Sequence, residues 1–478
     1  MSPRSSAARS SWRTVGRPAP ARGGWSVARA DVSTELTDEA PVGSTIASVT
    51  RRRTPTRVPA SRYTSPEWAE RELTHLWPHV WQIACTVDHV AAPGDYFVYD
   101  VGPYSVLIVR GDDGDLHAFQ NVCRHRGNAL CEGAGGGLGE LRCNYHRWTW
   151  DLQGRLREVP SRKGFGALRN DDFPLLPVQV ATWGPLVFVN MDLDAGPLEA
   201  FLEGVPADIE WAGIDDFHCT YNIAVPMPCN WKTLIDGFSE TYHVQGIHRE
   251  MLPMVDDVNS PQTLWDHHGK LEQPYGVPSP RLGGGVDAQT VWAAFIAVMG
   301  TRIGKPSVDD AGPAPHVTDG GSLRSVLADM VRAVGVDQGL DLSNFTDDQL
   351  LNLQQYNLFP NATVLVFPDL FQVVKSRPGD TPDTTIMDAL VFARRARADT
   401  SPPARPVDVT VAPGDADFGL VLNQDVVALQ RVQRGMHQPG FTHLTLSSEE
   451  CRIINLHRNL ERYLSISPTE IIGGEPTS

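Results

Sequence analysis

Cys123-Arg124-His125 and Cys143-Asn144-Tyr145-His146 are the two segments that decide the fold of this chain. Each segment combines one Cys with one His, and seventeen residues separate His125 from Cys143. Thiolates and imidazoles are the side chains that bind transition metals most readily. The spacing therefore predicts a metal centre held between the tips of two loops, with one sulfur and one nitrogen donor from each.

The order of the donors separates two kinds of centre. In a Rieske [2Fe–2S] cluster, two thiolates bind one iron and two imidazoles bind the other. A structural zinc site also uses two Cys and two His, but it groups them as Cys–Cys and His–His pairs. The alternating order favours the Rieske cluster, with Cys123, His125, Cys143 and His146 as its ligands.

Composition limits the class of protein. A chain of 478 residues suggests two to three domains. The formal charge of −16 argues against nucleic acid as a partner and is compatible with docking against a basic region of a redox partner. No apolar run reaches the length of about eighteen residues that a membrane helix needs, so we expect a cytoplasmic protein with no membrane partner.

The cysteines do not suggest a disulfide-stabilised protein. There are seven, an odd number at low density, which is atypical of secreted disulfide-rich domains. Cys131 lies between the two ligand segments. Rieske proteins of respiratory complexes have a disulfide that joins these loops, but the position of the partner cysteine is similar to that of Tyr145 in this chain. We therefore interpret Cys131 as a free, packed thiol.

Three regions follow from the patterning. Residues 1–57 are rich in Ser, Arg, Ala and Pro and are predicted to be a disordered leader, with a transit peptide as the alternative. Residues 60–195 are predicted to form a small antiparallel β domain. Its expected strands are residues 94–101, 105–109, 116–121, 147–151, 155–158, 178–181 and 186–191.

Residues 200–465 predict a larger domain with an antiparallel sheet and a long C-terminal helix, so the fold class is α+β. The expected strands are residues 217–225, 363–375 and 384–395. The expected helices are residues 230–243, 289–299, 322–334, 415–436 and 447–464. The last helix opens with Ser447-x-x-Glu450, a capping box.

A second metal site is predicted within residues 230–248. Asp236, Glu240 and His243 recur at i, i+4 and i+7, so one helix would carry them on one face. His248 follows after Gly246, which we expect to break the helix and let the second imidazole approach the first. Two His and one carboxylate form the facial triad of non-haem iron oxygenases. The alternative is a capped helix end with surface histidines.

The carboxylate of this triad must come from elsewhere in the chain. Asp425 is the best candidate because it lies within a predicted helix among apolar residues. By residue type alone, four others remain open: Asp369, Asp388, Asp415 and Asp417.

The motifs together resemble the large (alpha) subunit of Rieske non-haem iron ring-hydroxylating oxygenases, over about residues 60–465. Besides the two cluster segments, the resemblance is carried by Asn230-Trp231-Lys232 followed by Glu240-x-Tyr242-His243, and by Gln424-Asp425 followed by Val432-Gln433-Arg434-Gly435-Met436. It implies a [2Fe–2S] cluster and mononuclear Fe(II), the latter bound by His243, His248 and Asp425.

The resemblance also assigns two acidic residues. Glu240 takes the place of an acid that links an iron-ligand His to a cluster His of a neighbouring subunit. Asp236 is expected to accept a hydrogen bond from a metal-bound His. The family implies a homotrimer, with or without a β subunit, that receives electrons from NAD(P)H through a separate reductase, with or without a ferredoxin.

The implied function is that of a terminal oxygenase, which inserts oxygen from O2 into an aromatic or alicyclic small molecule. Glu at position 240 leaves open a monooxygenase or demethylase acting on a quaternary-ammonium, N-methyl or methoxy substrate. A Rieske electron carrier with a binding domain is the non-enzymatic alternative. Four aromatic residues are expected to be core residues, with a cage for a cation as the alternative: Trp265, Tyr275, Trp292 and Phe295.

Overall fold

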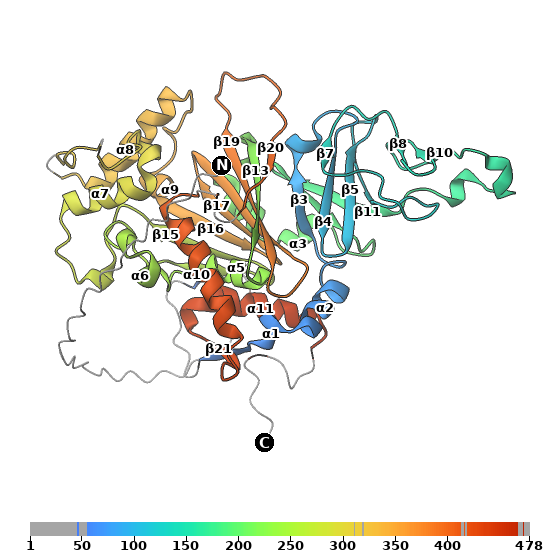
Figure 1. The fold of residues 1–478 in the computed structure, drawn as a ribbon. Helices are drawn as coiled ribbons and strands as arrows, with labels where there is room; N and C mark the ends of the chain where they lie inside the picture. The colour runs from blue at the N-terminus through green and yellow to red at the C-terminus, as the bar shows by residue number, and fades with distance from the viewer. Residues whose placement is uncertain are drawn as a thin grey trace, which may run out of the picture. The chain divides into compact units, whose positions relative to one another are not determined.

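A seven-stranded antiparallel sheet forms the core of the N-terminal part of the protein (Figure 1). The computed structural model describes residues 45–46, 55–309, 311–317, 320–412, 415, 418–466 and 472, so nearly all of the predicted leader lies outside the described residues. The strand order is β3-β12-β11-β6-β5-β4-β7. The strands are β3 (Gln82–Thr86), β4 (Tyr96–Val101), β5 (Tyr104–Arg110), β6 (Leu116–Gln120), β7 (Ala134–Gly135), β11 (Pro177–Trp183) and β12 (Leu186–Asn190).

The predicted hairpin between the second and third expected strands is present as β5 and β6. Gly114, with φ +86°, allows the tight turn between them. Strand β3 was not predicted. All five of its residues are buried, so it lacks the alternation that marks a half-buried strand.

A small three-stranded sheet, in the order β10-β9-β8, carries the second ligand segment. Its strands are β8 (Leu141–Arg142), β9 (Thr149–Trp150) and β10 (Leu156–Glu158). Residues 143–148 form the turn from β8 to β9. The first ligand segment follows directly after β6, so both Cys-His pairs lie where strands give way to loops.

A nine-stranded sheet forms the core of the C-terminal part, in the order β1-β14-β15-β16-β17-β18-β19-β13-β20. All of its neighbours are antiparallel except β13 and β20. The strands are β1 (Thr45–Ile46), β13 (Phe217–Met227), β14 (Gln262–Leu264), β15 (Gly269–Pro274), β16 (Asn352–Leu358), β17 (Ala362–Phe367), β18 (Leu370–Pro378), β19 (Thr385–Arg394) and β20 (Val407–Thr410).

The predicted single strand over residues 363–375 is wrong. It is two strands, β17 and β18, which pair with each other. Pro368 and Asp369 form the turn between them, because proline has no N–H to continue a ladder.

Helices lie against this sheet at the end where β13 leads into α5, which contacts β18 (Figure 1). The helices of this group are α1 (Ser61–Thr64), α2 (Pro66–His75), α5 (Trp231–Gly237), α6 (Val244–Ile247), α10 (Leu420–Met436) and α11 (Cys451–Tyr463). The expected capping box of Ser447 and Glu450 is present, in the short 3-10 turn that precedes α11.

The remaining helices are shorter or more peripheral. They are α3 (Leu198–Leu202), α4 (Val205–Ile209), α7 (Ala288–Met299), α8 (Leu323–Asp337) and α9 (Asp347–Leu351). In the described part of the chain, no helix is both long and apolar enough to cross a membrane.

Cations of the nine-stranded sheet attach it to the seven-stranded sheet. Lys375 in β18 donates to the carbonyl oxygens of Ile83 and Ala84 in β3, at 3.1 and 2.9 Å. Arg377 donates to the carbonyl oxygen of Asp100 at 2.8 Å. Segments from the two sides of the sequence also pair, since β2 (Thr56–Pro59) is antiparallel to β21 (His443–Leu446).

Two candidate metal centres

The two cluster loops have the same backbone geometry. In the first, the N–H of Gly127 donates to the carbonyl of Cys123 at 3.0 Å. In the second, the N–H of Arg147 donates to the carbonyl of Cys143 at 2.9 Å. Both closing residues have positive φ, +79° for Gly127 and +63° for Arg147. Arg147 adopts a left-handed conformation that ordinarily favours glycine. Such strained backbone is concentrated at functional sites, in agreement with a role for this loop in metal binding.

The four predicted donors converge at these loop tips. Cys123 and Cys143 are buried, and the rings of His125 and His146 lie 4.6 Å apart between centroids. Burial, and after it the neighbouring Cys143 thiol, raise the pKa of Cys123, which is consistent with adjacent sulfur atoms.

This donor set fits a [2Fe–2S] cluster. The Nδ1 atom of His125 is buried and has no hydrogen-bond partner among the described residues, although buried ring nitrogens are normally paired. The ring of His125 is held by stacking on Trp148, with centroids 5.3 Å apart and planes at 3°. Cys131 is a free cysteine, as expected.

The second group of donors converges around α6 and α10. His243 precedes α6, His248 follows it, and Asp425 lies in α10. One ligand atom from each of the three lies within 4.8 Å of the other two. The Nε2 atom of His248 lies 2.9 Å from Oδ1 of Asp425, and the Nε2 atom of His243 lies 3.8 Å from the same oxygen.

The opposite nitrogens of these rings have polar partners that fix their tautomers. The Nδ1 atom of His243 lies 2.6 Å from Oε1 of Glu240, and the Nδ1 atom of His248 lies 2.6 Å from Oε1 of Gln424. Because these acceptors require a proton on Nδ1, both rings present Nε2 lone pairs toward Asp425. Two imidazole nitrogens and one carboxylate directed to a single point fit a mononuclear iron.

Gln424 was quoted in the sequence motif but was not predicted to have a role. Its amide N–H donates to Glu250, at 2.5 Å, so its orientation is fixed as well. No sequence signal identifies such a partner, because 176 residues separate Gln424 from His248.

The predicted helix over residues 230–243 is wrong. Helix α5 ends at Gly237, and residues 238–242 form a turn, so Asp236, Glu240 and His243 do not share a helix face. Glycine is a poor helix former, and at this position a Cβ atom would lie only 3.1 Å from Leu429 of α10. Gly246 lies inside α6, and the helix ends at Ile247 instead, with His248 as its C-cap.

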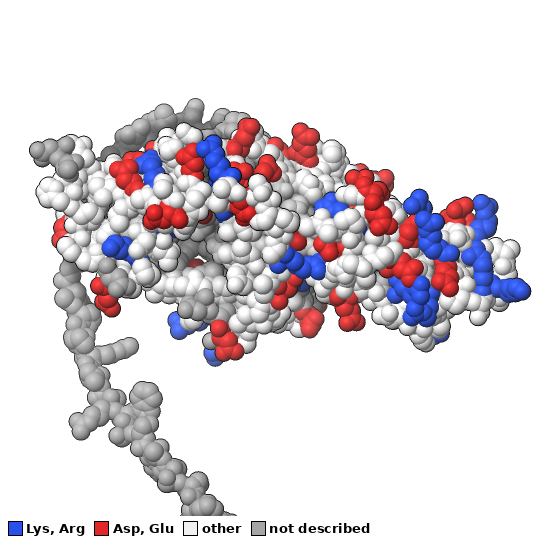
Figure 2. All heavy atoms as spheres, turned by 90° about the horizontal axis from the view of Figure 1, so that it is seen from above, with Lys and Arg blue, Asp and Glu red and all other residues white. Residues whose placement is uncertain are grey.

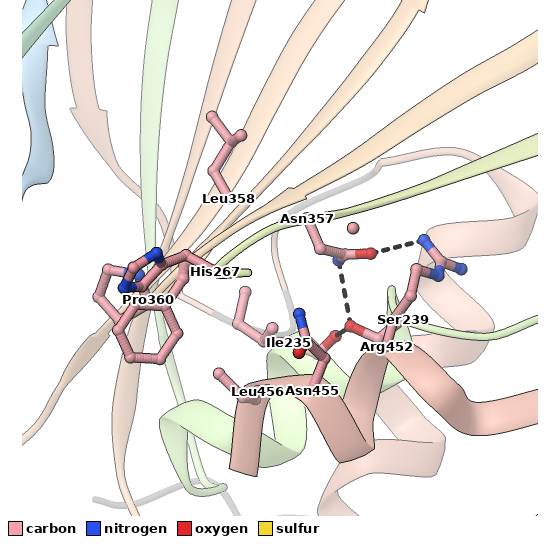
Figure 3. A pocket seen from close by; sticks show the side chains of 11 residues that line it. Ile235, Ser239, His267, Asn357, Leu358, Pro360, Arg452, Asn455 and Leu456 are labelled. Carbon is pink, nitrogen blue, oxygen red and sulfur yellow. Dashed lines mark hydrogen bonds between the residues drawn. The ribbon is translucent and has the colours of Figure 1, made fainter. Parts of the chain in front are cut away.

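Polar side chains of β16 and α11 hold this turn. Asn357 donates from Nδ2 to the carbonyl of Phe238 at 3.2 Å and to Oγ of Ser239 at 3.1 Å. Arg452 in turn donates to Oδ1 of Asn357 at 2.5 Å. Figure 3 shows the bonds of Asn357 with Ser239 and Arg452 beside a cavity of about 20 Å³ whose lining also includes Ile235. These bonds fix Phe238 and Ser239, the two residues that precede Glu240 in the chain.

Asp236 differs from the expectation. Its Oδ2 atom accepts a hydrogen bond from the Tyr63 hydroxyl at 2.5 Å, and its Oδ1 atom is buried with no partner among the described residues, so it does not accept from either triad histidine. The Tyr63 hydroxyl also lies 2.7 Å from Nε2 of His457. Burial lowers the pKa of His457 far enough to keep the ring neutral, so Nε2–H donates to Tyr63 and Tyr63 donates to Asp236.

The other carboxylates considered for the triad have partners of their own or lie elsewhere. Asp369 pairs with Arg302, and Asp388 pairs with Arg377. Asp415 is not among the residues that converge on the two histidines. Asp417 lies outside the described residues.

The aromatic residues considered as a cation cage are packed in two different hydrophobic cores. Tyr275, Trp292 and Phe295 are buried in the core that includes α7 and α8. Trp265 packs against another core and stacks on Tyr356, with centroids 6.4 Å apart. The expectation that they are core residues is confirmed, and they do not form one cage.

Comparison with known proteins gives two family matches. Residues 80–180 match the family described as Rieske [2Fe-2S] domain, and residues 214–466 match the family described as Ring hydroxylating alpha subunit (catalytic domain). The first match contains the four cluster donors, and the second contains the three donors of the triad.

Individual relatives match over a smaller part. The chain is 30% identical over 208 residues to the glycine betaine monooxygenase oxygenase subunit of Pseudomonas aeruginosa, which is 43% of this chain and 48% of that protein. It is 30% identical over 226 residues to the carnitine monooxygenase oxygenase subunit of Escherichia coli, which is 47% of this chain and 59% of that protein. The chain thus spans about half the length of the curated relatives it matches.

Solved structures share the fold. A quaternary ammonium Rieske monooxygenase in complex with L-carnitine has a TM-score of 0.60 at 18% identity, covering 86% of this chain and 96% of that one. Naphthalene 1,2-dioxygenase with bound indole has a TM-score of 0.60 at 16% identity, covering 89% and 95%. The chain therefore belongs to the ring-hydroxylating alpha subunit family of Rieske non-haem iron oxygenases, whose members carry a [2Fe–2S] cluster and a mononuclear iron.

Proposed function

We propose that this protein is the oxygenase component of a Rieske monooxygenase that hydroxylates or demethylates a quaternary-ammonium substrate. The observation that carries the oxygenase assignment is the convergence of His243, His248 and Asp425 in a chain that also has a Rieske domain. An electron carrier would have no use for the triad. The substrate class is supported by the relatives, which include glycine betaine, carnitine and choline monooxygenases.

The aromatic or alicyclic oxygenase that we expected from the sequence is less well supported. It shares the fold, through naphthalene 1,2-dioxygenase, but that similarity has only 16% identity. Glu240 is compatible with the quaternary-ammonium alternative, which the sequence left open.

We assign the donors as follows. Cys123, His125, Cys143 and His146 would hold the cluster, and His243, His248 and Asp425 would hold Fe(II). When bound, the two metals supply electron storage and activation of O2. Glu240 and Gln424 hold the Nδ1 protons of the two histidines, so that each ring keeps its Nε2 free for the metal.

The partners follow from the position of Glu240. In this chain its carboxylate contacts the side chain and N–H of His243, whereas the cluster histidines lie beside the small three-stranded sheet. We propose a homotrimer in which Glu240 of one subunit meets a cluster histidine of the next. Electrons would come from NAD(P)H through a separate reductase.

A turnover screen tests the proposal. The iron- and cluster-loaded protein is incubated with a Rieske reductase, NADH and O2, with glycine betaine, carnitine, choline, benzoate or a methoxybenzoate as substrate. We expect products from a quaternary-ammonium compound that have gained one oxygen or lost one methyl group as formaldehyde, with a matched His243→Ala protein giving none. A product with two added oxygens from the aromatic acid alone would support the dioxygenase reading instead.

A further inference from the structure

A positively charged segment lies beside the candidate cluster, in a chain of formal charge −16. Residues 155–169, which we call the basic arm, run from β10 through a short 3-10 helix over Arg162–Phe165. The arm has one acidic residue, Glu158, and five cationic ones: Arg155, Arg157, Arg162, Lys163 and Arg169. Figure 2 shows blue Lys and Arg spheres gathered at the end of the view where Figure 1 labels β8 and β10.

The positive charge of the arm is only partly balanced within the chain. The side chains of Arg155 and Arg157 are 66% and 58% exposed, and both pair with the same carboxylate, that of Asp151. Lys163 and Arg169 are exposed and make no ion pair with any residue that the structure describes. One carboxylate thus serves two guanidinium groups, and two further cations face solvent.

An exposed ring connects the arm to a candidate cluster ligand. Phe165 is 43% exposed, and its edge meets the rings of His125 and Trp148, with centroids 5.6 and 5.4 Å away. A protein seated on the arm would therefore be separated from His125 by a single aromatic side chain.

We infer that the basic arm is the docking surface for an acidic one-electron carrier protein that reduces the cluster. This inference rests on the proposed function. In each encounter, one electron leaves the reduced carrier and enters the oxidised cluster, and no atom is transferred. A permanent contact between copies would bury and pair its charges, whereas transient redox complexes are small and depend on exposed, complementary charge.

The test compares two charge-reversed proteins. The first is Lys163→Glu with Arg169→Glu. The control is Arg57→Glu with Arg397→Glu, which makes the same change in net charge at exposed positions in β2 and in the segment after β19. The probe is a plant-type [2Fe–2S] ferredoxin, an acidic protein. Stopped-flow bleaching gives the second-order rate constant for cluster reduction, and titration gives the Kd for the oxidised ferredoxin.

At low ionic strength, we expect the arm variant to show a rate constant and an affinity about tenfold lower than those of the control. Added salt should slow the wild-type protein and the control but have little effect on the arm variant. Reduction by dithionite and the visible spectrum should be unchanged, because no assigned ligand is altered.

Three results would overturn the inference: equal constants for the arm variant and the control, no reduction of the wild-type protein by the ferredoxin, or a changed molecular mass of the arm variant in light scattering. The last result would make the arm a contact between copies. Failure of the proposed function looks different, because the wild-type protein would then give no product from the quaternary-ammonium compounds while the ferredoxin still reduced its cluster.

Discussion

Glu240 is the residue whose substitution separates electron delivery from metal binding. Its carboxylate accepts from the ring and the N–H of His243 and supplies no ligand atom to the triad. We predict that Glu240→Gln keeps both metals, because glutamine preserves an acceptor for the histidine proton. Turnover should fall by about 10- to 100-fold, the range for altered partners of metal ligands, because an uncharged amide replaces the carboxylate of the proposed bridge. Normal turnover, measured by substrate oxidation, would remove the bridging role.

Substitution of His243 distinguishes the mononuclear iron site from the cluster site. We predict that His243→Ala loses the mononuclear iron and keeps the cluster, because the rings of His125 and His146 belong to different loops from the triad. Metal analysis should show about one iron fewer per chain, while visible absorption stays the same. Loss of the absorption would show that the two donor groups have been assigned to the wrong centres.

Asp236 gives a prediction about pH. Burial raises its pKa to about 7, above the value of about 3.9 in an unfolded chain. Between these two pH values, the folded protein holds a proton that the unfolded chain releases. The free energy of unfolding therefore falls as pH rises from about 4 to about 7, by at most about 1.4 kcal/mol per pH unit. Above about pH 7 this contribution no longer changes.

The pH prediction is checked by urea unfolding at a series of pH values. Asp236→Asn should remove this component of the slope, because asparagine does not titrate in this range. An exposed control, Asp329→Asn, should keep it. The same slope in Asp236→Asn as in the wild type would contradict the buried, protonated carboxyl.

At this scale the sequence predicted the residues that are recognisable by type and spacing. The two Cys-His segments and the pair His243 and His248 are of that kind. It did not predict Gln424 or the Tyr63–His457 network, because those hydrogen bonds join residues 176 and 394 positions apart.

At the scale of elements, the turn between α5 and α6 is the feature that positions Glu240 and His243. Asn357 of β16 bonds to Phe238 and Ser239 within that turn. We predict that Asn357→Ala destabilises the protein by about 1 kcal/mol, because Ser239 and Arg452 each lose a partly buried partner, while the Phe238 carbonyl still accepts from Gln355. Activity should fall as well.

Urea unfolding and turnover of Asn357→Ala check this, with Asn259→Ala as the control. Among the described residues, the side chain of Asn259 bonds to Asp256 alone, in an exposed loop. Its replacement should therefore change stability by less than about 0.5 kcal/mol. Equal stability of the two variants would mean that β16 does not hold the turn.

The sequence predicted those helices whose apolar residues recur at the helical repeat. It predicted α7, α8 and α11 to within a few residues because their apolar positions follow the helical repeat. It extended α5 through Gly237 because the polar spacing of Asp236, Glu240 and His243 imitates a helix face. It missed β14, β15 and β16, which pair across a region rich in Gly, Pro and Asp.

At the scale of the whole molecule, Lys375 is one of the polar links between the two sheets. It is 3% exposed and donates to two carbonyls of β3. We predict that Lys375→Met destabilises the protein by about 3 kcal/mol, because it leaves two buried carbonyls without a donor and Asp388 without one of its cations. Lys163→Met, at an exposed site, should be nearly neutral.

Unfolding followed separately at the cluster absorption and by far-ultraviolet circular dichroism checks this link. We expect the two transitions to separate in Lys375→Met and to coincide in the wild type. Coincident transitions with unchanged midpoints in the variant would show that other contacts join the sheets. The sequence could not predict this link, since 292 residues separate Lys375 from Ile83.

The account as a whole depends on one chain holding two different iron centres. Iron and acid-labile sulfide analysis of the purified, reconstituted protein tests this most directly. We predict about three iron atoms and two sulfide ions per chain, with His125→Ala losing the sulfide and His243→Ala losing only one iron. Zinc in place of iron, with no acid-labile sulfide, would contradict the account.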